Sequence, residues 1–453
     1  MHLHTPNGRA QTILQSVDEG LSHAEMPIAI FNDPDLHRLE LERVFSRSWT
    51  YIGHVSEIPA RGDYVVRYIA EDPFIFVRDE DGKIRLFWNS CRHKGTEICR
   101  VDRGNASHFR CPYHGWTYKN TGQLVGIPAF KQAYAGLDRS AFPLHSVPRL
   151  EEIYGFVFAN LDAEAPSLRD SLGEATWYLD FFHGLGDMEV IGDPHRWVVD
   201  ANWKIAAENF AGDEHHLLFL HRSGWKVGAL QVSIEELSSG YHVHLGNGHT
   251  IDFCVLPNAA ELGVEYFGYP DHIVRQFRTS HLSDQQLELA KNSVIQLGLI
   301  YPNFAHLHLA LTPDAANIPP IPVKTVRVFQ PKGPDRMEIW SWCLVWKEMP
   351  EDFKELSHRV LTATFSPSGI FEQDDVIPWN SITRAAGSTF ARLKKPMLSY
   401  RQGFNGTGTS RMVTDWVGPG ECYSPRFEEG NQRDFYGRWL RDMRRPVQEG
   451  SQI

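Results

Sequence analysis

Two short pairs of cysteine and histidine constrain this chain more than any other feature. Cys91-Arg92-His93 is followed, after 17 intervening residues, by Cys111-Pro112-Tyr113-His114. Two thiolates and two imidazoles can hold one tetrahedral zinc ion. They can also hold a [2Fe–2S] cluster, with the cysteines on one iron and the histidines on the other. Either centre requires the two pairs to meet in space. Loops at the tips of two β-hairpins achieve this, and we expect both pairs at such tips.

The residues around these pairs predict a small all-β domain. Segments within 64–88 are rich in β-branched and aromatic residues, and Asp81-Gly82 between two of them is a hairpin signal. Short strands separated by turns continue to about residue 160. A length of 453 residues suits two or three domains. We therefore expect one domain at 45–160 and a larger domain formed by 1–44 and 161–453.

The larger domain is expected to mix helices and strands. Residues 202–220 favour a helix, and another helix is expected to begin at Ser283. Strands are expected at 305–312, 325–329 and 337–346. This order of elements predicts an antiparallel sheet flanked by helices. The predicted fold class of the whole chain is therefore α+β.

A second metal-type pattern lies in the first of these expected helices. Two histidines and one carboxylate on one face of a metal form the triad of non-haem Fe(II) oxygenases, which leaves positions open for O2. His216 and His221 are separated by about 140° on an ideal helix, so a straight helix cannot direct both at one ion. We expect the helix to end or kink near Phe219 and Leu220. His215 competes with His216 for the first position.

Both patterns resemble those of the Rieske aromatic ring-hydroxylating oxygenases. Cys91-x-His93 with Cys111-Pro112-Tyr113-His114-Gly115-Trp116 is similar to the family's cluster motif. The spacing of the iron-binding segment of the family's α subunits is matched at every step by Asn209, Asp213, His216 and His221.

A third segment, Phe371-Glu372-Gln373-Asp374-Asp375, resembles the one that carries the remaining iron ligand in this family. The ligand there is the second aspartate, so Asp375 is the expected ligand and Asp374 the close competitor. The Asn-Trp pair that usually follows is displaced here, to Trp379-Asn380.

The resemblance implies a role for each of these residues. One [2Fe–2S] Rieske cluster per chain would be held by Cys91, His93, Cys111 and His114. One mononuclear Fe(II) per chain would be held by His216, His221 and Asp375. Asp213 would carry electrons as a bridge between His114 of one subunit and His216 of its neighbour. The substrate pocket would include Asn209, Phe210, Phe365 and Phe371, with His306 or His308 as further lining.

The resemblance also implies an activity and its partners. Members of this family are terminal oxygenase components that usually insert both atoms of O2 into an aromatic ring, giving a cis-dihydrodiol. Their electrons come from NADH through a reductase and usually a ferredoxin. No G-x-G-x-x-G fingerprint follows a strand in this sequence, so NADH would act only indirectly. An α3 trimer is expected, or an α3β3 assembly with a small β subunit.

Alternatives remain open at this point. A Rieske monooxygenase or demethylase would share both metal motifs, and so would a dioxygenase of an aromatic acid. An electron-transfer protein and a zinc hydrolase with a structural zinc module are the rival classes. Residues 227–270 contain no Lys or Arg. This favours an uncharged ring, single or polycyclic, over an aromatic acid, which would need an arginine clamp.

Composition excludes other classes of partner. The formal net charge is −11, which argues against nucleic acid because phosphate binding needs a basic surface. No apolar run approaches the roughly 20 residues that span a bilayer, and the N-terminal residues lack the apolar core of a secretory signal. Six scattered cysteines favour a reducing compartment, and we expect a cytoplasmic protein.

Overall fold

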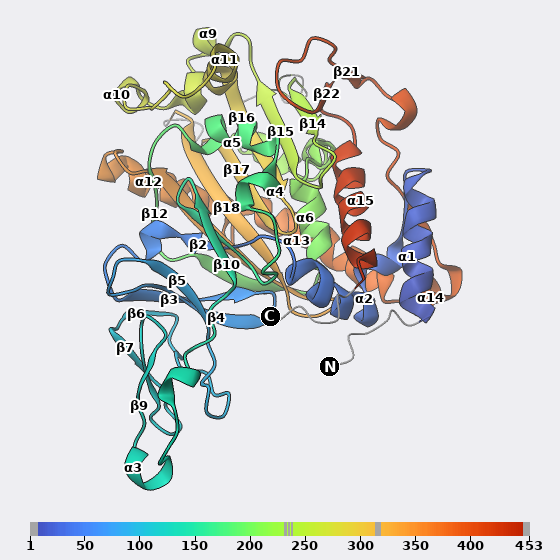
Figure 1. Cartoon of the computed structure of the whole chain (residues 1–453). Helices are drawn as coiled ribbons and strands as arrows, with labels where there is room; N and C mark the ends of the chain where they lie inside the picture. Colours follow the sequence, from blue (N-terminus) through green and yellow to red (C-terminus); the bar gives the residue numbers. More distant parts are fainter. Residues whose placement is uncertain (1–7, 231–232, 234–235, 237–238, 313–318, 447–453) are drawn as a thin grey trace. The chain divides into compact units, whose positions relative to one another are not determined.

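The computed structural model describes residues 8–230, 233, 236, 239–312 and 319–446 (Figure 1). The chain folds into two compact units. The smaller is Ser46–Leu168, and the larger combines the described residues up to Phe45 with those from Arg169 onward.

The smaller unit runs past the expected end at residue 160. Hydrogen bonds connect the residues after that point to the rest of this unit. The indole N–H of Trp49 donates to the Pro166 carbonyl at 3.1 Å, and the Leu168 N–H donates to the Glu151 carboxylate at 2.8 Å. These contacts keep the residues up to Leu168 with the smaller unit.

Antiparallel strands make up the smaller unit. One sheet has the order β5-β4-β3-β6 and consists of β3 (Asp63–Ile69), β4 (Asp72–Arg78), β5 (Ile84–Trp88) and β6 (Arg103–Asn105). A second has the order β7-β8-β9 and consists of β7 (His108–Arg110), β8 (Thr117–Lys119) and β9 (Leu124–Gly126). The third joins β2 (Thr50–His54), β10 (Arg149–Ile153) and β11 (Phe156–Asn160). The short helix α3 (Phe130–Ala133) follows β9.

Only one of the two cysteine–histidine pairs lies at a hairpin tip. The pair that begins at Cys111 connects β7 and β8, which are antiparallel neighbours, as expected. The pair that begins at Cys91 connects β5 and β6, which lie at opposite edges of their sheet. The expectation of a second hairpin was wrong, because β3 and β4 pair between these two strands and the loop must cross from edge to edge.

One long antiparallel sheet forms the centre of the larger unit. Its order is β12-β19-β18-β17-β16-β15-β14-β22-β21, with β13 also paired to β19. The strands are β12 (Met188–Val190), β13 (His195–Val199), β14 (Tyr241–His244), β15 (Thr250–Val255), β16 (Ser293–Ile300), β17 (Phe304–Leu311), β18 (Ile321–Pro331), β19 (Met337–Trp346), β21 (Arg411–Met412) and β22 (Glu421–Ser424). Strands β18 and β19 cover the segments predicted at 325–329 and 337–346, and β17 covers the one predicted at 305–312 except for its last residue. A separate small sheet pairs β1 (Glu25–Pro27) with β20 (Met397–Ser399).

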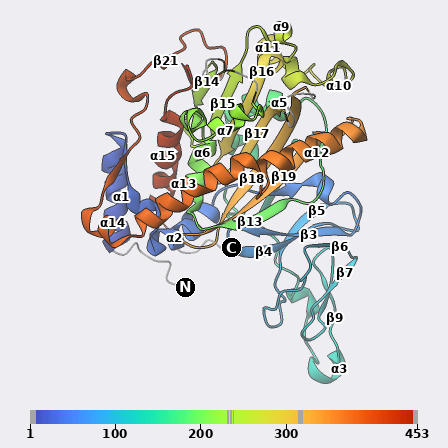
Figure 2. The ribbon, with the colours of Figure 1, turned by 180° about the vertical axis from the view of Figure 1, so that it is seen from behind.

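Helices cover both faces of the long sheet, which confirms the α+β class. The main helices of the chain are α1 (Gly8–Leu21), α2 (Pro34–Glu40), α4 (Leu168–Leu172), α5 (Ala175–His183), α6 (Trp203–Phe210), α7 (Arg222–Lys226), α11 (Asp284–Asn292), α12 (Glu351–Phe365), α13 (Ile370–Ala386), α14 (Thr389–Lys394) and α15 (Gly430–Arg444). In Figure 1 α5 lies on the near face of the sheet, and Figure 2 shows α12 and α13 crossing the opposite face. Helix α11 begins after Ser283 as predicted, because the Ser283 hydroxyl accepts the Gln286 N–H.

The expected helix over 202–220 is broken much earlier than predicted. Helix α6 ends at Phe210, and the 3-10 helix η5 (Glu214–Leu218) follows it. Between them Gly212 adopts φ 119°, a conformation that residues other than glycine rarely adopt. The second break, at Phe219, lies where the spacing of the histidines placed it. Among the residues described, no helix is long and apolar enough to cross a bilayer.

Candidate metal centres

The two cysteine–histidine loops of the smaller unit share one backbone pattern. In each loop the cysteine N–H donates to the carbonyl five residues ahead, at 2.9 Å for Cys91 and 2.8 Å for Cys111. Each cysteine carbonyl accepts the N–H of a glycine four residues ahead, at 2.9 Å for Gly95 and 3.1 Å for Gly115. Both glycines have positive φ, 78° and 70°, which glycine adopts without steric cost. The sequence therefore builds two equivalent tight turns that present donor groups.

The histidines of these loops lie together. The ring centroids of His93 and His114 are 4.5 Å apart, and the Trp116 indole stacks on His93 at 5.0 Å. The Nε2 of His93 lies 3.2 Å from the Tyr134 hydroxyl, which fixes the ring orientation. The Nδ1 of His93 is buried and has no hydrogen-bond partner among the described residues. An unpaired buried nitrogen is unfavourable, and a metal bond at Nδ1 would satisfy it.

The cysteine thiols lie on the buried side of the same loops. Cys91 and Cys111 are both buried, and the Cys91 sulfur is 3.3 Å from the Tyr118 hydroxyl. Burial raises the pKa of the Cys91 thiol, and the neighbouring Cys111 thiol also acts to raise this pKa, against the lowering effect of the Tyr118 hydrogen bond. A bound cation is what would keep the two thiols ionised in this environment. The four residues therefore fit the donor set of a Rieske cluster.

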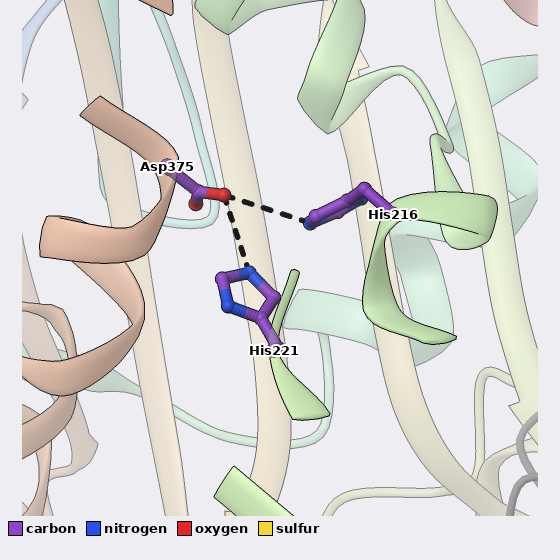
Figure 3. Close-up of side chains that lie close together, drawn as sticks. All are labelled: His216, His221 and Asp375. Atoms are coloured by element: carbon purple, nitrogen blue, oxygen red, sulfur yellow. Dashed lines mark ion pairs between the residues drawn. The ribbon is translucent and has the colours of Figure 1, made fainter. Parts of the chain in front are cut away.

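Three side chains converge at a separate point of the larger unit (Figure 3). The Asp375 Oδ1 lies 3.7 Å from the Nε2 of His216 and 3.2 Å from the Nε2 of His221. The two imidazole rings are 4.8 Å apart at 73°. The Asp375 Oδ1 is buried without a hydrogen-bond partner. Two nitrogens and one carboxylate oxygen around one point are the two-histidine, one-carboxylate arrangement of a mononuclear iron site.

The backbone explains how these residues meet. His216 lies on η5, and His221 follows the break at Phe219 and precedes α7. The carboxylate comes from the first turns of α13. The segment 371–375 is thus helical.

The two competitors lie outside this group. His215 is exposed, and its ring centroid lies 6.4 Å from that of Phe427. The Asp374 Oδ2 faces the other nitrogen of His221, its Nδ1, at 3.3 Å and accepts a hydrogen bond from the Ser223 hydroxyl. Burial alone would lower the pKa of His221, but Asp375 and Asp374 raise it overall. The same negative charge favours a bound cation.

Asp213 approaches His216 from the other side. Its carbonyl oxygen accepts the Nδ1–H of His216, and its carboxylate Oδ2 is 3.7 Å from that nitrogen. The Asp213 side chain is 40% exposed, so it can be reached from outside this chain. The Asp213 N–H donates to the Asn209 carbonyl at 3.1 Å, which ties the turn to the end of α6.

An apolar cavity opens beside the three converging side chains. Its described lining is Asn209, Phe210, Glu214, His216, Leu217, His221, Leu230, Ile295, Leu297, Leu307, Leu309, Phe365, Phe371 and Asp375. The four pocket residues expected from the sequence are all among them. Phe371 packs between the site and the cavity wall, 5.1 Å from the His221 ring and 5.3 Å from Phe365. The described lining contains no Lys or Arg.

The expectation that His306 or His308 lines the pocket was wrong. His306 packs against Phe182, with ring centroids 5.4 Å apart, and His308 stacks on Phe267 at 3.7 Å. Side chains alternate between the two faces of a strand, so the intervening residues of β17, Leu307 and Leu309, face the cavity instead. The sequence of β17 alternates leucine with histidine, and the leucines indicate which face of the strand lines the cavity.

Two family models match the chain. Residues 48–148 match the model of the Rieske [2Fe-2S] domain, and residues 168–444 match that of the ring hydroxylating alpha subunit (catalytic domain). The alpha subunit of benzene 1,2-dioxygenase from Pseudomonas putida is 34% identical over 432 residues, which cover 92% of this chain and 90% of that protein. The alpha subunit of N,N-dimethyl phenylurea N-demethylase from Sphingobium sp. strain YBL2 is 34% identical over 440 residues, covering 95% and 94%.

The fold also resembles a solved structure over nearly its whole length. Naphthalene 1,2-dioxygenase from Rhodococcus sp. bound to indole superposes with a TM-score of 0.90 at 41% sequence identity. The match covers 97% of this chain and 99% of that one.

Proposed function

The chain belongs to the α subunits of the Rieske ring-hydroxylating oxygenases, and from this premise we propose that it oxygenates uncharged aromatic rings as the terminal component of a dioxygenase. As a member of this family it is an oxidoreductase with one Rieske [2Fe–2S] cluster and one mononuclear iron per chain. One observation carries the proposal on the substrate. The three converging donor groups open onto an apolar cavity whose described lining has no cationic side chain.

The chain's own residues supply the two sets of ligands in this proposal. The cluster is held by Cys91, His93, Cys111 and His114. The iron is held by His216, His221 and Asp375, and supplies the activation of O2 when it is bound. The outer partners Asp213 and Asp374 orient the two histidines through their Nδ1 atoms, which fixes the nitrogen that faces the metal.

The cavity binds and orients the ring. Phe365 and Phe371 form an aromatic wall, and the leucines of β17 form the opposite apolar surface. A mostly apolar lining without Lys or Arg offers no cationic clamp to a carboxylate, so burial of a charged substrate there would be costly. Addition of both atoms of O2 to the ring requires two electrons and two protons, and gives a cis-dihydrodiol.

The electrons enter from outside the catalytic unit in this proposal. Asp213 connects His216 to His114 of a neighbouring subunit, which makes the active unit an α3 ring, alone or with a small β subunit. The partial exposure of the Asp213 side chain supports this role. A ferredoxin or a reductase delivers the electrons to the cluster, and NADH acts only through them.

N-demethylation is the second candidate function. The similarity to the Sphingobium N-demethylase covers nearly the whole chain. A substituted phenylurea is an uncharged aromatic molecule, so the apolar lining suits it as well. The two reactions differ in product, because demethylation releases formaldehyde and adds no oxygen to the ring.

The test is a single turnover of the prereduced holoenzyme with 18O2 and matched substrates. We expect naphthalene to give a dihydrodiol that carries two 18O atoms. The corresponding acid, 2-naphthoate, should react at least about tenfold more slowly, because its carboxylate finds no partner in the cavity. Preference for the acid would overturn the proposed substrate class. Formaldehyde release from an N,N-dimethyl phenylurea, with no dihydrodiol from any aromatic hydrocarbon, would favour the second candidate.

A further inference from the structure

A cluster of two histidines and a glutamate lies beside the turn that carries Asp213. His242 and His244 project from β14, and Glu428 precedes α15. The His242 Nδ1–H donates to the Glu428 Oε1 at 2.9 Å, and the His244 Nε2 pairs with the same oxygen. The Gly430 N–H also donates to this oxygen, at 2.8 Å. No part of the proposed chemistry uses this cluster.

The cluster is better explained as a hydrogen-bond network than as a metal site, although its donor atoms lie within 4.8 Å of one another. The second Glu428 oxygen is 3.2 Å from the Arg433 guanidinium, whose charge opposes a bound cation. Burial alone would raise the pKa of Glu428, but the hydrogen bonds from His242 and His244 hold it well below its usual range. Glu428 is therefore a charged acceptor on which both histidines converge.

The other nitrogen of His242 reaches the turn. The His242 Nε2–H donates to the Gly212 carbonyl at 3.2 Å. A Cβ on Gly212 would lie 2.4 Å from that nitrogen, so the contact requires glycine as well as its positive φ. The next carbonyl, that of Asp213, accepts the Nδ1–H of His216. Two successive carbonyls of the turn are thus held by two imidazoles, one from the cluster and one from the iron site.

Glu214, on the other side of Asp213 from Gly212, is also held by buried side chains. The Glu214 carboxylate is 3.0 Å from the guanidinium of Arg426, which also pairs with Asp252. Asp252 lies directly opposite His242 in the pairing of β14 with β15. All four side chains are at most 5% exposed. The residues on both sides of Asp213 are therefore held by buried side chains, Gly212 by His242 and Glu214 by Arg426.

We propose that His242 is a positioning residue that holds the Gly212 carbonyl and so places Asp213 between the two metal centres. This rests on the proposed role of Asp213 as the electron bridge. His242 touches neither substrate nor metal in this account. Loss of its Nε2–H lets the Gly212 peptide rotate, which displaces both the Asp213 carboxylate and the carbonyl that orients His216. Displacements of about 1 Å can slow such reactions by roughly 100-fold.

Two amide variants separate the two hydrogen bonds of His242. The His242→Gln side chain places an N–H near the position of Nε2, and His242→Asn places one near that of Nδ1. Glutamine therefore keeps the donor to Gly212, whereas asparagine keeps the donor to Glu428 and leaves Gly212 without one. His242→Phe keeps the ring and removes both. The matched control is His249→Phe, because the Nε2–H of buried His249 also donates to a backbone carbonyl, that of Ser171 at 2.9 Å.

Each variant is measured as the holoenzyme. Single turnover of the prereduced protein gives the rate of cluster re-oxidation, and titration of iron-depleted protein with Fe(II) gives the iron affinity. We expect His242→Asn and His242→Phe to lower both by about 10- to 100-fold, the usual effect of losing an outer partner. His242→Gln should stay within about threefold of wild type, and His249→Phe should change thermal stability without changing either quantity.

The results separate this inference from the proposed function. If Asp213→Asn blocks re-oxidation while all His242 variants behave like wild type, the positioning role is wrong and the bridge stands. If Asp213→Asn re-oxidises at the wild-type rate, the proposed bridge itself is wrong. Equal losses of re-oxidation rate and iron affinity in His242→Gln and His242→Asn would show that His242 acts only through packing. A metal ion beyond three irons per chain, present in wild type and lost in these variants, would show that the cluster is a metal site.

Poor folding of the His242 variants would not end the test. Glu428→Gln leaves His242 in place and replaces the carboxylate that accepts its Nδ1–H with an amide, which is a weaker acceptor. It should slow re-oxidation by at least about threefold through a weaker hold on Gly212. A wild-type rate in Glu428→Gln would overturn the inference.

Discussion

At the scale of single residues, the candidate iron site depends on which atom of a side chain faces which neighbour. Asp374 and Asp375 are consecutive, yet they contact opposite nitrogens of His221. Only the Asp375 oxygen also approaches His216. Both residues are aspartates, so the residue type alone could not show which one is the iron ligand. Their positions on α13 decide the direction in which each carboxylate points.

Asp375→Asn and Asp374→Asn form a matched pair at this scale. We expect Asp375→Asn to lose the mononuclear iron, because the amide removes the anionic donor of the site. Asp374→Asn should retain iron at saturating Fe(II), with an affinity about 10- to 100-fold lower. Metal analysis and Fe(II) titration measure both. Equal iron loss in the two variants would show that the assignment of ligand and outer partner is wrong.

Alanine variants of His216 and His221 test the division of the ligands. Each should remove one iron of three per chain and keep the red-brown absorption of the cluster, because the proposed cluster ligands lie in the other compact unit. Metal analysis and visible spectra give the two readings. Bleaching of the cluster with the mononuclear iron retained would contradict the assignment of both sets.

At the scale of elements, local patterns predict strands better than they predict breaks in helices. The strand β19 begins and ends where its composition placed it, at Met337 and Trp346. The early end of α6 was not predicted, because the periodicity of the sequence does not reveal the positive φ that Gly212 adopts, where a Cβ would meet the ring of His242, which is distant in sequence. The prediction for β17 was wrong for a different reason, because the strand alternates histidines with leucines and the leucines face the cavity.

The alternation in β17 gives a prediction about substrate size. Leu307→Phe adds volume on the cavity side of the strand. Turnover of a two-ring substrate should fall at least about tenfold relative to a one-ring substrate, with the iron content unchanged. Leu299→Phe is the control, because Leu299 is buried in β16 but outside the described lining of the cavity. If both variants changed the ratio equally, Leu307 would not set the size of the cavity.

The turns of the cluster loops give another prediction at this scale. Gly115→Ala should reduce the cluster content of the purified protein, because its Cβ would lie 2.9 Å from Pro128 at a positive φ. Gly95→Ala carries only the conformational cost of about 1–2 kcal/mol, since the nearest atom to its Cβ is 3.8 Å away. The ratio of visible cluster absorption to protein measures both. A larger loss in Gly95→Ala would contradict this order.

At the scale of the whole molecule, the long sheet divides the larger unit into two chemically different sides. One side carries the donor groups and the cavity, and the other carries a buried lysine. Lys324, on β18, donates to the Phe182 carbonyl and lies 4.7 Å above the Trp346 ring. His306 and His308 face the same region. The sequence alone does not predict that Lys324 is buried, because lysine is almost always at least partly exposed.

Burial of Lys324 predicts a specific dependence of stability on pH. Desolvation lowers the pKa of Lys324 to about 7, whereas in the unfolded chain it titrates near its ordinary value of about 10.4. Between these values the unfolded state binds a proton that the folded state does not, so stability falls as pH falls from 10 to 7. Lys324→Met removes this contribution. Its melting temperature relative to wild type should therefore rise as the pH is lowered, by an amount equivalent to a few kcal/mol at most.

Lys354→Met provides the opposite control for the same measurement. Burial alone would lower the pKa of Lys354, but its ion pairs with Glu189 and Glu351 raise it overall. Its stabilising contribution is therefore present at pH 7 and is lost only as pH rises through the raised pKa. Lys354→Met should lower the melting temperature relative to wild type, and this difference should stay nearly constant from pH 7 to 10. Calorimetry of the three proteins over this range measures the slopes, and a flat difference between Lys324→Met and wild type would mean that Lys324 is charged in the folded protein.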